Sequence, residues 1–147
     1  MKIGSSIFLV SLIVQVSVNI LFLKSYPVQT YEYEGIATHL LKNKTFSCEK
    51  LGTTYYSLTP PLYPMVNAMV YFLTNYNHTA MRFVQMVFLA LTCSVIYLIA
   101  KDVFDEGAGV VASVLCMLHP GLIFYSTRRL HELTMVSFLF SLLILAV

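Results

Sequence analysis

Residues 3–23 read IGSSIFLVSLIVQVSVNILFL, and no charged side chain interrupts this stretch between Lys2 and Lys24. A helix of about 20 apolar residues crosses the roughly 30 Å of hydrocarbon in a bilayer. The alternative is a cleaved signal peptide, which has a shorter apolar core of about 7–15 residues and small residues at its cleavage site. The sequence KSYP that follows offers no such site. We therefore predict an uncleaved membrane anchor.

The composition of the whole chain indicates the same class of protein. Of its 147 residues, 58% are apolar and 11% are charged, and the mean hydropathy is +0.76. Soluble domains carry about 25% charged residues, so these values indicate an integral membrane protein. The net charge of +2 is small and scattered, which argues against nucleic acid as a partner. Cys48, Cys93 and Cys116 form no C-x-x-C pair, and we predict neither a disulfide framework nor a metal–cysteine site.

Three further apolar stretches predict additional membrane spans. Residues 83–100 form a second span, and residues 108–125 form a third that contains a His-Pro pair. Proline is tolerated in a membrane helix where neighbouring groups satisfy the freed carbonyl. Residues 133–147 begin a fourth span but stop short of the roughly 20 residues needed, so we expect a piece of a longer protein. The predicted fold is all-α and polytopic, with about four spans in one membrane domain over residues 1–147.

The first loop, residues 26–77, is the long polar region of the chain. Within residues 32–41 the apolar side chains recur on one face of a helix, which predicts an amphipathic helix lying on the membrane surface. Residues 62–73 are apolar but cover only about 18 Å as a helix, so we favour a second surface helix over a crossing. Residues 43–54, between the two, read as a polar loop. The stripe of the first surface helix consists of Tyr33, Ile36, Ala37, Leu40 and Leu41.

The placement of residues 62–73 decides which charges share a face of the membrane. If the first span exits outward and this segment does not cross, the outer face carries three groups of charges: Glu32 with Glu34, Arg82, and the turn at 128–132. The overall distribution of lysine and arginine favours the opposite orientation, although that rule is weaker for long loops.

Several motifs follow the anchor helix in a fixed order: Glu32-Tyr33-x-x-Ile36-Ala37-x-x-Leu40-Leu41, Pro60-Pro61-Leu62-Tyr63-Pro64, a span led by Arg82, His119-Pro120, and Glu132. In this order the motifs resemble the N-terminal part of the GT-C membrane glycosyltransferases, and the protein mannosyltransferase and aminoarabinose transferase group in particular. The resemblance covers nearly the whole chain, and its specificity lies in the order and spacing of the motifs.

The resemblance implies a function and a location. Members of this group transfer a sugar from a polyprenyl-phosphate carrier to a hydroxyl, on the outer or lumenal face, with a general base from the first external loop. Many relatives have an aspartate where this chain has Gln29, so the resemblance assigns the base to Glu32 first and to Glu34 second. It also implies a multi-pass protein of the plasma or inner membrane, or of the endoplasmic reticulum, with its active face outward or lumenal.

Transfer to a hydroxyl needs a base for the acceptor proton, cations for the departing phosphate, and alignment of donor and acceptor. An inverting displacement needs one base and no covalent sugar intermediate. Arginines bind phosphate through paired hydrogen bonds, although arginines beside a span also extend to lipid headgroups without any catalytic role. The residues expected to bind the substrates are Arg82, Arg128, Arg129, His131 and Glu132.

Several of these residues have a competing structural explanation. Glu132 opens a membrane helix, where the helix dipole favours a carboxylate on structural grounds alone. His131 would point about 100° away from Glu132 if both lay on that helix. Glu32 and Glu34 could equally be solvated carboxylates of a surface helix.

The expected partners are membrane lipid, the lipid-phosphate sugar donor, and a hydroxyl acceptor on protein, lipid or glycan. We predict no cofactor, and no cluster of ligands in the sequence argues for a metal site; the sequence does not decide whether the reaction needs a divalent metal. The alternative function is a non-catalytic scaffold or subunit, or a fragment of a transporter. A transport path needs polar residues in the spans, and the notable ones are few: Gln15, Asn19, Gln85 and His119.

Overall fold

The computed structural model describes residues 2–23, 32–50, 52–56, 59–128 and 130–147. Within these ranges the chain forms seven helices and one two-stranded sheet. The predicted all-α, membrane-type architecture is therefore confirmed in outline, and the small sheet is its exception.

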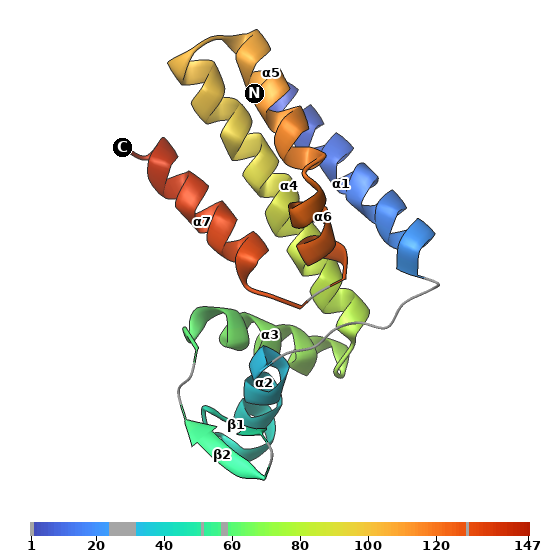
Figure 1. Cartoon of the computed structure of the whole chain (residues 1–147), viewed down its shortest axis with the longest axis vertical. Coiled ribbons are helices and arrows are strands. Elements are labelled where there is room, and N and C mark those ends of the chain that lie inside the picture. Colours follow the sequence, from blue (N-terminus) through green and yellow to red (C-terminus); the bar gives the residue numbers. More distant parts are fainter. Residues whose placement is uncertain (1, 24–31, 51, 57–58, 129) are drawn as a thin grey trace.

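The elements form two layers (Figure 1). A helical bundle contains α1 (Lys2–Leu23), α4 (His78–Val103), α5 (Glu106–Met117), α6 (Pro120–Thr127) and α7 (Leu133–Leu145). A smaller layer lies beyond the end of the bundle at which α4 and α7 begin. It contains α2 (Glu32–Asn43), β1 (Ser47–Lys50), β2 (Thr53–Tyr56) and α3 (Leu62–Thr74).

Helix α4 is the centre of the bundle and packs against α1, α5 and α7. Gly109 lets α5 approach it closely, because a Cβ atom at this position would lie 2.9 Å from the carbonyl oxygen of Tyr97. Helix α1 turns its polar side to the bundle. Ser11, Gln15 and Asn19 are buried, while its large apolar side chains are exposed, among them Leu9, Ile13 and Ile20. This inverted pattern suits a helix surrounded by lipid, since polar side chains in a bilayer face other helices.

Two helices in the described part of the chain, α1 and α4, are long and apolar enough to span a membrane. The third span predicted at 108–125 is divided into α5 and α6, which meet at a bend of 53°, and counting this pair gives up to three spans. The break has a local cause, because Pro120 starts α6 and the His119 Nδ1 accepts the Leu122 N–H at 3.3 Å. Helix α7 is shorter, so the prediction of about four spans is not established.

The apolar stripe predicted at 32–41 is present in α2, but protein rather than lipid covers it. Tyr33, Ile36 and Ala37 are at most 9% exposed, and α2 packs on α3. Helix α3 instead presents an exposed apolar stripe, which suits a helix lying on a membrane surface. The stripe consists of Leu62, Met65, Met69, Phe72 and Leu73.

The prediction of a simple polar loop at 43–54 is wrong. Strands β1 and β2 pair antiparallel, from Ser47 opposite Tyr56 to Lys50 opposite Thr53. Gly52, with φ of +76°, lies between the strands. The packing of α2 also stabilises the hairpin, because the polar side of α2 covers β1. The His39 Nδ1 lies 3.2 Å from the Ser47 Oγ, and a Cβ atom at Gly35 would lie 3.4 Å from that of Cys48.

Candidate functional site at the end of the bundle

The segments that carry the described candidate site residues meet where the smaller layer adjoins the bundle (Figure 1). Three segments contribute: the start of α2, the first turns of α4, and the turn between α6 and α7. Sequence reasoning placed these segments on one face of the membrane, and the structure brings them into contact. Arg129 and Gln29 lie outside the described residues.

Tyr33 is the central contact of this site. Its ring meets that of His131 edge-on, with centroids 5.5 Å apart, and the negative charge of Glu132 acts on its hydroxyl. Burial, together with the negative charges of Glu132 and Glu32, raises the pKa of Tyr33 to about 12. Tyr33 therefore remains a protonated donor at neutral pH, and two carboxylates act on one hydroxyl group.

The proline-rich motif supplies the support beneath Tyr33. Tyr63 is 1% exposed, and its ring lies 5.1 Å from that of Tyr33 in an edge-on arrangement. Burial raises the pKa of Tyr63 well above its usual range, with smaller contributions from Tyr71, Tyr33 and Glu132. Pro61 precedes α3, and its carbonyl accepts the Met65 N–H at 3.1 Å. The start of this helix thus places Tyr63 in the core next to the site.

Gln85 of α4 holds the turn between α6 and α7 in place. Its amide nitrogen donates to the carbonyl oxygens of Tyr125 at 3.3 Å and of His131 at 2.9 Å. Gln85 is fully buried. A polar residue that the sequence offered as a lining for a transport path therefore braces the segment that carries two candidate site residues.

His131 and Glu132 precede α7 instead of lying on it, so the expectation that they point 100° apart is wrong. Helix α7 begins at Leu133, whose N–H donates to the His131 Nδ1 at 3.2 Å. Glu132 takes the N-cap position without a capping hydrogen bond from its side chain. Its negative charge acts on the hydroxyl of Tyr33, and the ring of His131 contacts the ring of Tyr33. Both residues therefore face the same partner.

Two arginines lie near each other at the same end of the bundle. Arg82 lies in the second turn of α4 and is 7% exposed, and its Nε is buried without a hydrogen-bond partner in the described structure. Arg128 ends α6, and its positive charge acts on Arg82. Adjacent guanidinium groups repel each other and favour an anion between them, and guanidinium groups suit phosphate oxygens in particular.

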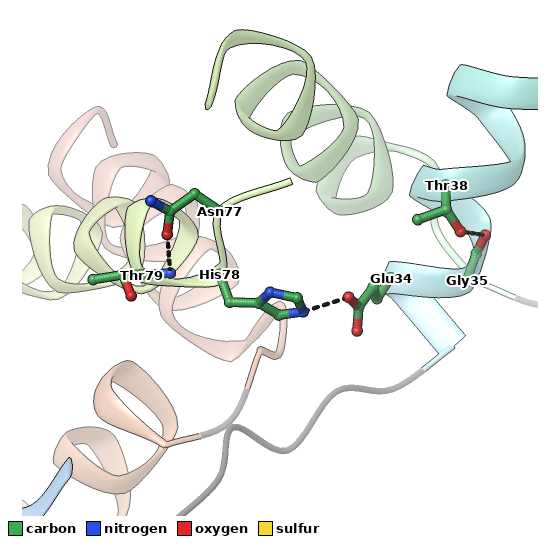
Figure 2. Close-up of polar contacts among 6 residues, drawn as sticks. All are labelled: Glu34, Gly35, Thr38, Asn77, His78 and Thr79. Carbon is green, nitrogen blue, oxygen red and sulfur yellow. Dashed lines mark hydrogen bonds and ion pairs between the residues drawn. The ribbon is translucent and has the colours of Figure 1, made fainter. Parts of the chain in front are cut away.

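Glu34 contacts a residue that sequence reasoning missed. Its Oε1 lies 2.5 Å from the Nε2 of His78, the first residue of α4 (Figure 2). Asn77 caps this helix by accepting the N–H groups of Thr79 at 2.9 Å and Ala80 at 3.4 Å. Asparagine before a helical stretch is a recognisable start signal, so the sequence could have placed the start of α4 at His78 instead of near residue 83. No feature of the sequence, however, indicates the contact between His78 and Glu34.

Among the described residues, no three of the His, Cys, Asp and Glu side chains gather to hold a metal ion. The comparison with family models identifies the class of protein, a membrane glycosyltransferase of the mannosyltransferase type. The chain belongs, more particularly, to the dolichyl-phosphate-mannose-protein mannosyltransferase family, whose family model matches residues 59–147. No curated protein and no solved structure matches it.

The family match confirms the resemblance inferred from the motifs. It includes Arg82, Arg128, His131 and Glu132, but it begins after Glu32 and Glu34. The membrane-integral nature of the family agrees with the apolar spans.

Proposed function

We propose that this protein transfers a sugar from a dolichyl- or polyprenyl-phosphate carrier to a hydroxyl acceptor, on the outer or lumenal face of the membrane. The family description favours mannose as the sugar and a protein as the acceptor. The observation that carries the proposal is the gathering of opposite charges at one end of the bundle. Glu32 and Glu132 both act on the hydroxyl of Tyr33, and Arg82 lies near Arg128.

Of the three carboxylates, we assign the general base to Glu32. Glu32 opens α2 and begins the motif Glu32-Tyr33-x-x-Ile36-Ala37, and the resemblance of this motif to the family's first external loop favours Glu32 as the base. Glu34 instead contacts His78 of α4. Glu132 and His131 then orient the acceptor and Tyr33.

The reaction is a single displacement with inversion at the anomeric carbon. The acceptor oxygen bonds to that carbon while its proton passes to the Glu32 carboxylate. The bond between the anomeric carbon and the phosphate oxygen breaks, and its electron pair leaves with the phosphate. Arg82 and Arg128 stabilise the negative charge that develops on this leaving group. The carrier is a substrate, and the proposal assigns no cofactor to the chain.

The position of the site suits a substrate whose phosphate lies at the membrane surface. The exposed stripe on α3, which includes Met69 and Phe72, provides an apolar face beside the site. A helix with such a face binds at the boundary between headgroups and acyl chains. The arginines at the end of the bundle would then meet the carrier phosphate at the depth where lipid phosphates reside.

The experiment is sugar transfer in membranes that contain the full-length protein, with radiolabelled dolichyl-phosphate mannose as the donor. Glu32→Gln should lower kcat about 100- to 10,000-fold, the usual contribution of a general base. Arg82→Lys, which keeps the charge but loses the paired hydrogen bonds, should lower kcat/KM by a smaller factor. Tyr56→Phe, an exposed position in β2, is the control.

Normal transfer by Glu32→Gln at matched expression would refute the base assignment. If Arg82→Lys also transferred sugar normally, the paired hydrogen bonds of Arg82 would have no catalytic role. If the wild type itself transferred no more sugar than membranes without the protein, the non-catalytic scaffold, or the transporter fragment, would be the better description of this chain.

A further inference from the structure

Glu34 and His78 connect two parts of the site that the reaction needs at a set separation. We propose that this pair is a positioning device for sugar transfer, which fixes α2 against the start of α4, and that Glu34 is not an alternative base. The inference rests on the proposed function for its catalytic consequence. The contact itself, and its effect on packing, can be measured independently of transfer.

The contact bridges distant parts of the chain. The two residues are 44 positions apart, the Nε2–Oε1 distance is 2.5 Å, and the side chains are 40% exposed for His78 and 19% exposed for Glu34. Glu34 follows Glu32 by two residues in the first turn of α2. His78 precedes Arg82 by four residues on α4, and residues four apart share one face of a helix. The pair therefore links the helix that carries the proposed base to the helix that carries a phosphate-binding cation.

Both ends of the link are held by other hydrogen bonds (Figure 2). On α4, the Asn77 Oδ1 accepts the Thr79 N–H at 2.9 Å, and this bond fixes the backbone beside His78. On α2, the Thr38 hydroxyl donates to the carbonyl oxygen of Gly35, the residue after Glu34, at 2.8 Å. Since neither backbone can adjust freely, the side-chain contact transmits a defined separation between the two helices.

Helix α3 completes the contact from a third side. The ring of Tyr71 lies 5.6 Å from that of His78. Burial raises the pKa of Tyr71 above its usual range, and the negative charge of Glu34 contributes in the same direction. Tyr71 is fully buried beside Tyr63 in the core of the smaller layer. The pair is therefore enclosed by α2, α3 and α4, which is where a positioning contact would be expected.

The helix ends favour a fixed carboxylate at this point. Glu34 lies in the first turn of its own helix and faces the first residue of α4. Its negative charge thus lies at the positive ends of two helix dipoles and next to His78. A carboxylate held by these three interactions is suited to anchor one helix against the other.

Loss of the contact should affect the rate of the chemical step more than donor binding. A displacement of about 1 Å at a reacting group can lower the rate 100-fold. An interaction that aligns groups for the transition state lowers kcat when it is lost and leaves KM largely unchanged. We therefore expect Glu34→Gln and His78→Gln each to lower kcat about tenfold, with KM for the donor changed less than twofold.

The experiment is a double-mutant cycle in the full-length protein. Glu34→Gln, His78→Gln and the double variant are compared for transfer from radiolabelled dolichyl-phosphate mannose and for Tm in detergent. The double variant should lose no more kcat and no more Tm than either single variant, because each change breaks the same contact. His78→Lys restores a cationic donor and should recover part of both. The control is His39→Gln, since His39 lies on α2 but contacts Ser47 of the hairpin.

The possible results distinguish a positioning role of the Glu34–His78 pair from a role of Glu34 as the base. If Glu34→Gln lowered kcat far more than His78→Gln, and the two losses multiplied, Glu34 would act on its own and the proposal would be wrong. Additive Tm losses would show that the two residues do not act as a pair, which also refutes it. If the Tm losses are non-additive but the wild type transfers no sugar, the pairing stands and the proposed function fails.

Discussion

Gln85 offers the sharpest test of how the bundle supports the site. It is fully buried in α4, and its amide donates to the carbonyl oxygens of Tyr125 in α6 and of His131 in the turn before α7. Gln85→Met keeps a similar volume and removes both donors. The change acts on the position of His131 and Glu132 without touching either side chain.

The magnitude follows from the two hydrogen bonds. A neutral hydrogen bond contributes about 0.5–1.5 kcal/mol in a folded protein, and measured values between membrane helices average about 0.6 kcal/mol. The bond to His131 at 2.9 Å has good length, while the bond to Tyr125 at 3.3 Å is long and weaker. We therefore expect Gln85→Met to lower the free energy of unfolding by about 1–2 kcal/mol, and kcat by roughly tenfold, because the turn loses its fixed position.

The assay pairs denaturant unfolding in mixed micelles with sugar transfer in membranes. Gln15→Met is the matched control, since Gln15 is equally buried but donates to Ser11 within α1, away from the site. The control should lose some stability and no transfer activity. Equal kcat for wild type and Gln85→Met would show that the turn does not depend on this brace, and would refute the reasoning.

Two further predictions concern packing and titration. Gly109→Ala should lower the free energy of unfolding by about 1–3 kcal/mol, because its Cβ would meet the Tyr97 carbonyl oxygen at 2.9 Å. Gly4→Ala is the control, since its Cβ would meet the Tyr97 ring only in ordinary contact at 3.9 Å. Equal stability of the two variants in mixed micelles would contradict the close approach of α5. The pKa of Tyr33 is raised to about 12 in the folded protein, so the unfolded protein releases this proton at a lower pH than the folded one. The resulting contribution to stability should be fully present below pH 10 and lost as pH rises through about 12. Between pH 9 and 11 the wild type should therefore lose more stability than Tyr33→Phe, by no more than about 3 kcal/mol for two pKa units, and parallel pH profiles of the two proteins would rule the effect out.

The long helices were predictable because the cause of their formation is local. In lipid each backbone N–H and C=O group must find its partner within the same segment, so an uncharged stretch of sufficient length becomes a helix. This holds for residues 3–23 and for the core of α4. The start of α4 was misplaced by five residues because the polar stretch from His78 to Arg82 does not look like a span, although the Asn77 cap marks it.

The division of the predicted third span depends on a balance that the sequence leaves open. Proline inside a membrane helix produces either a kinked continuous helix or a break, according to what satisfies the freed backbone groups. Here the His119 side chain accepts the Leu122 N–H, and this capping contact accompanies the break between α5 and α6. The hairpin of β1 and β2 is a similar case, since strands this short depend on the cover that α2 provides.

The sequence by itself determined the membrane class, the order of the motifs and the family, because composition and motif spacing are properties of the chain alone. It also placed Glu32, Arg82 and Glu132 on one predicted face. Only the tertiary structure decided which of these groups touch. The ring contact between Tyr33 and His131 and the contact between Glu34 and His78 join residues far apart in the chain. Such contacts arise from the packing of α2 and α3 on the end of the bundle, and no local preference of the residues involved encodes them.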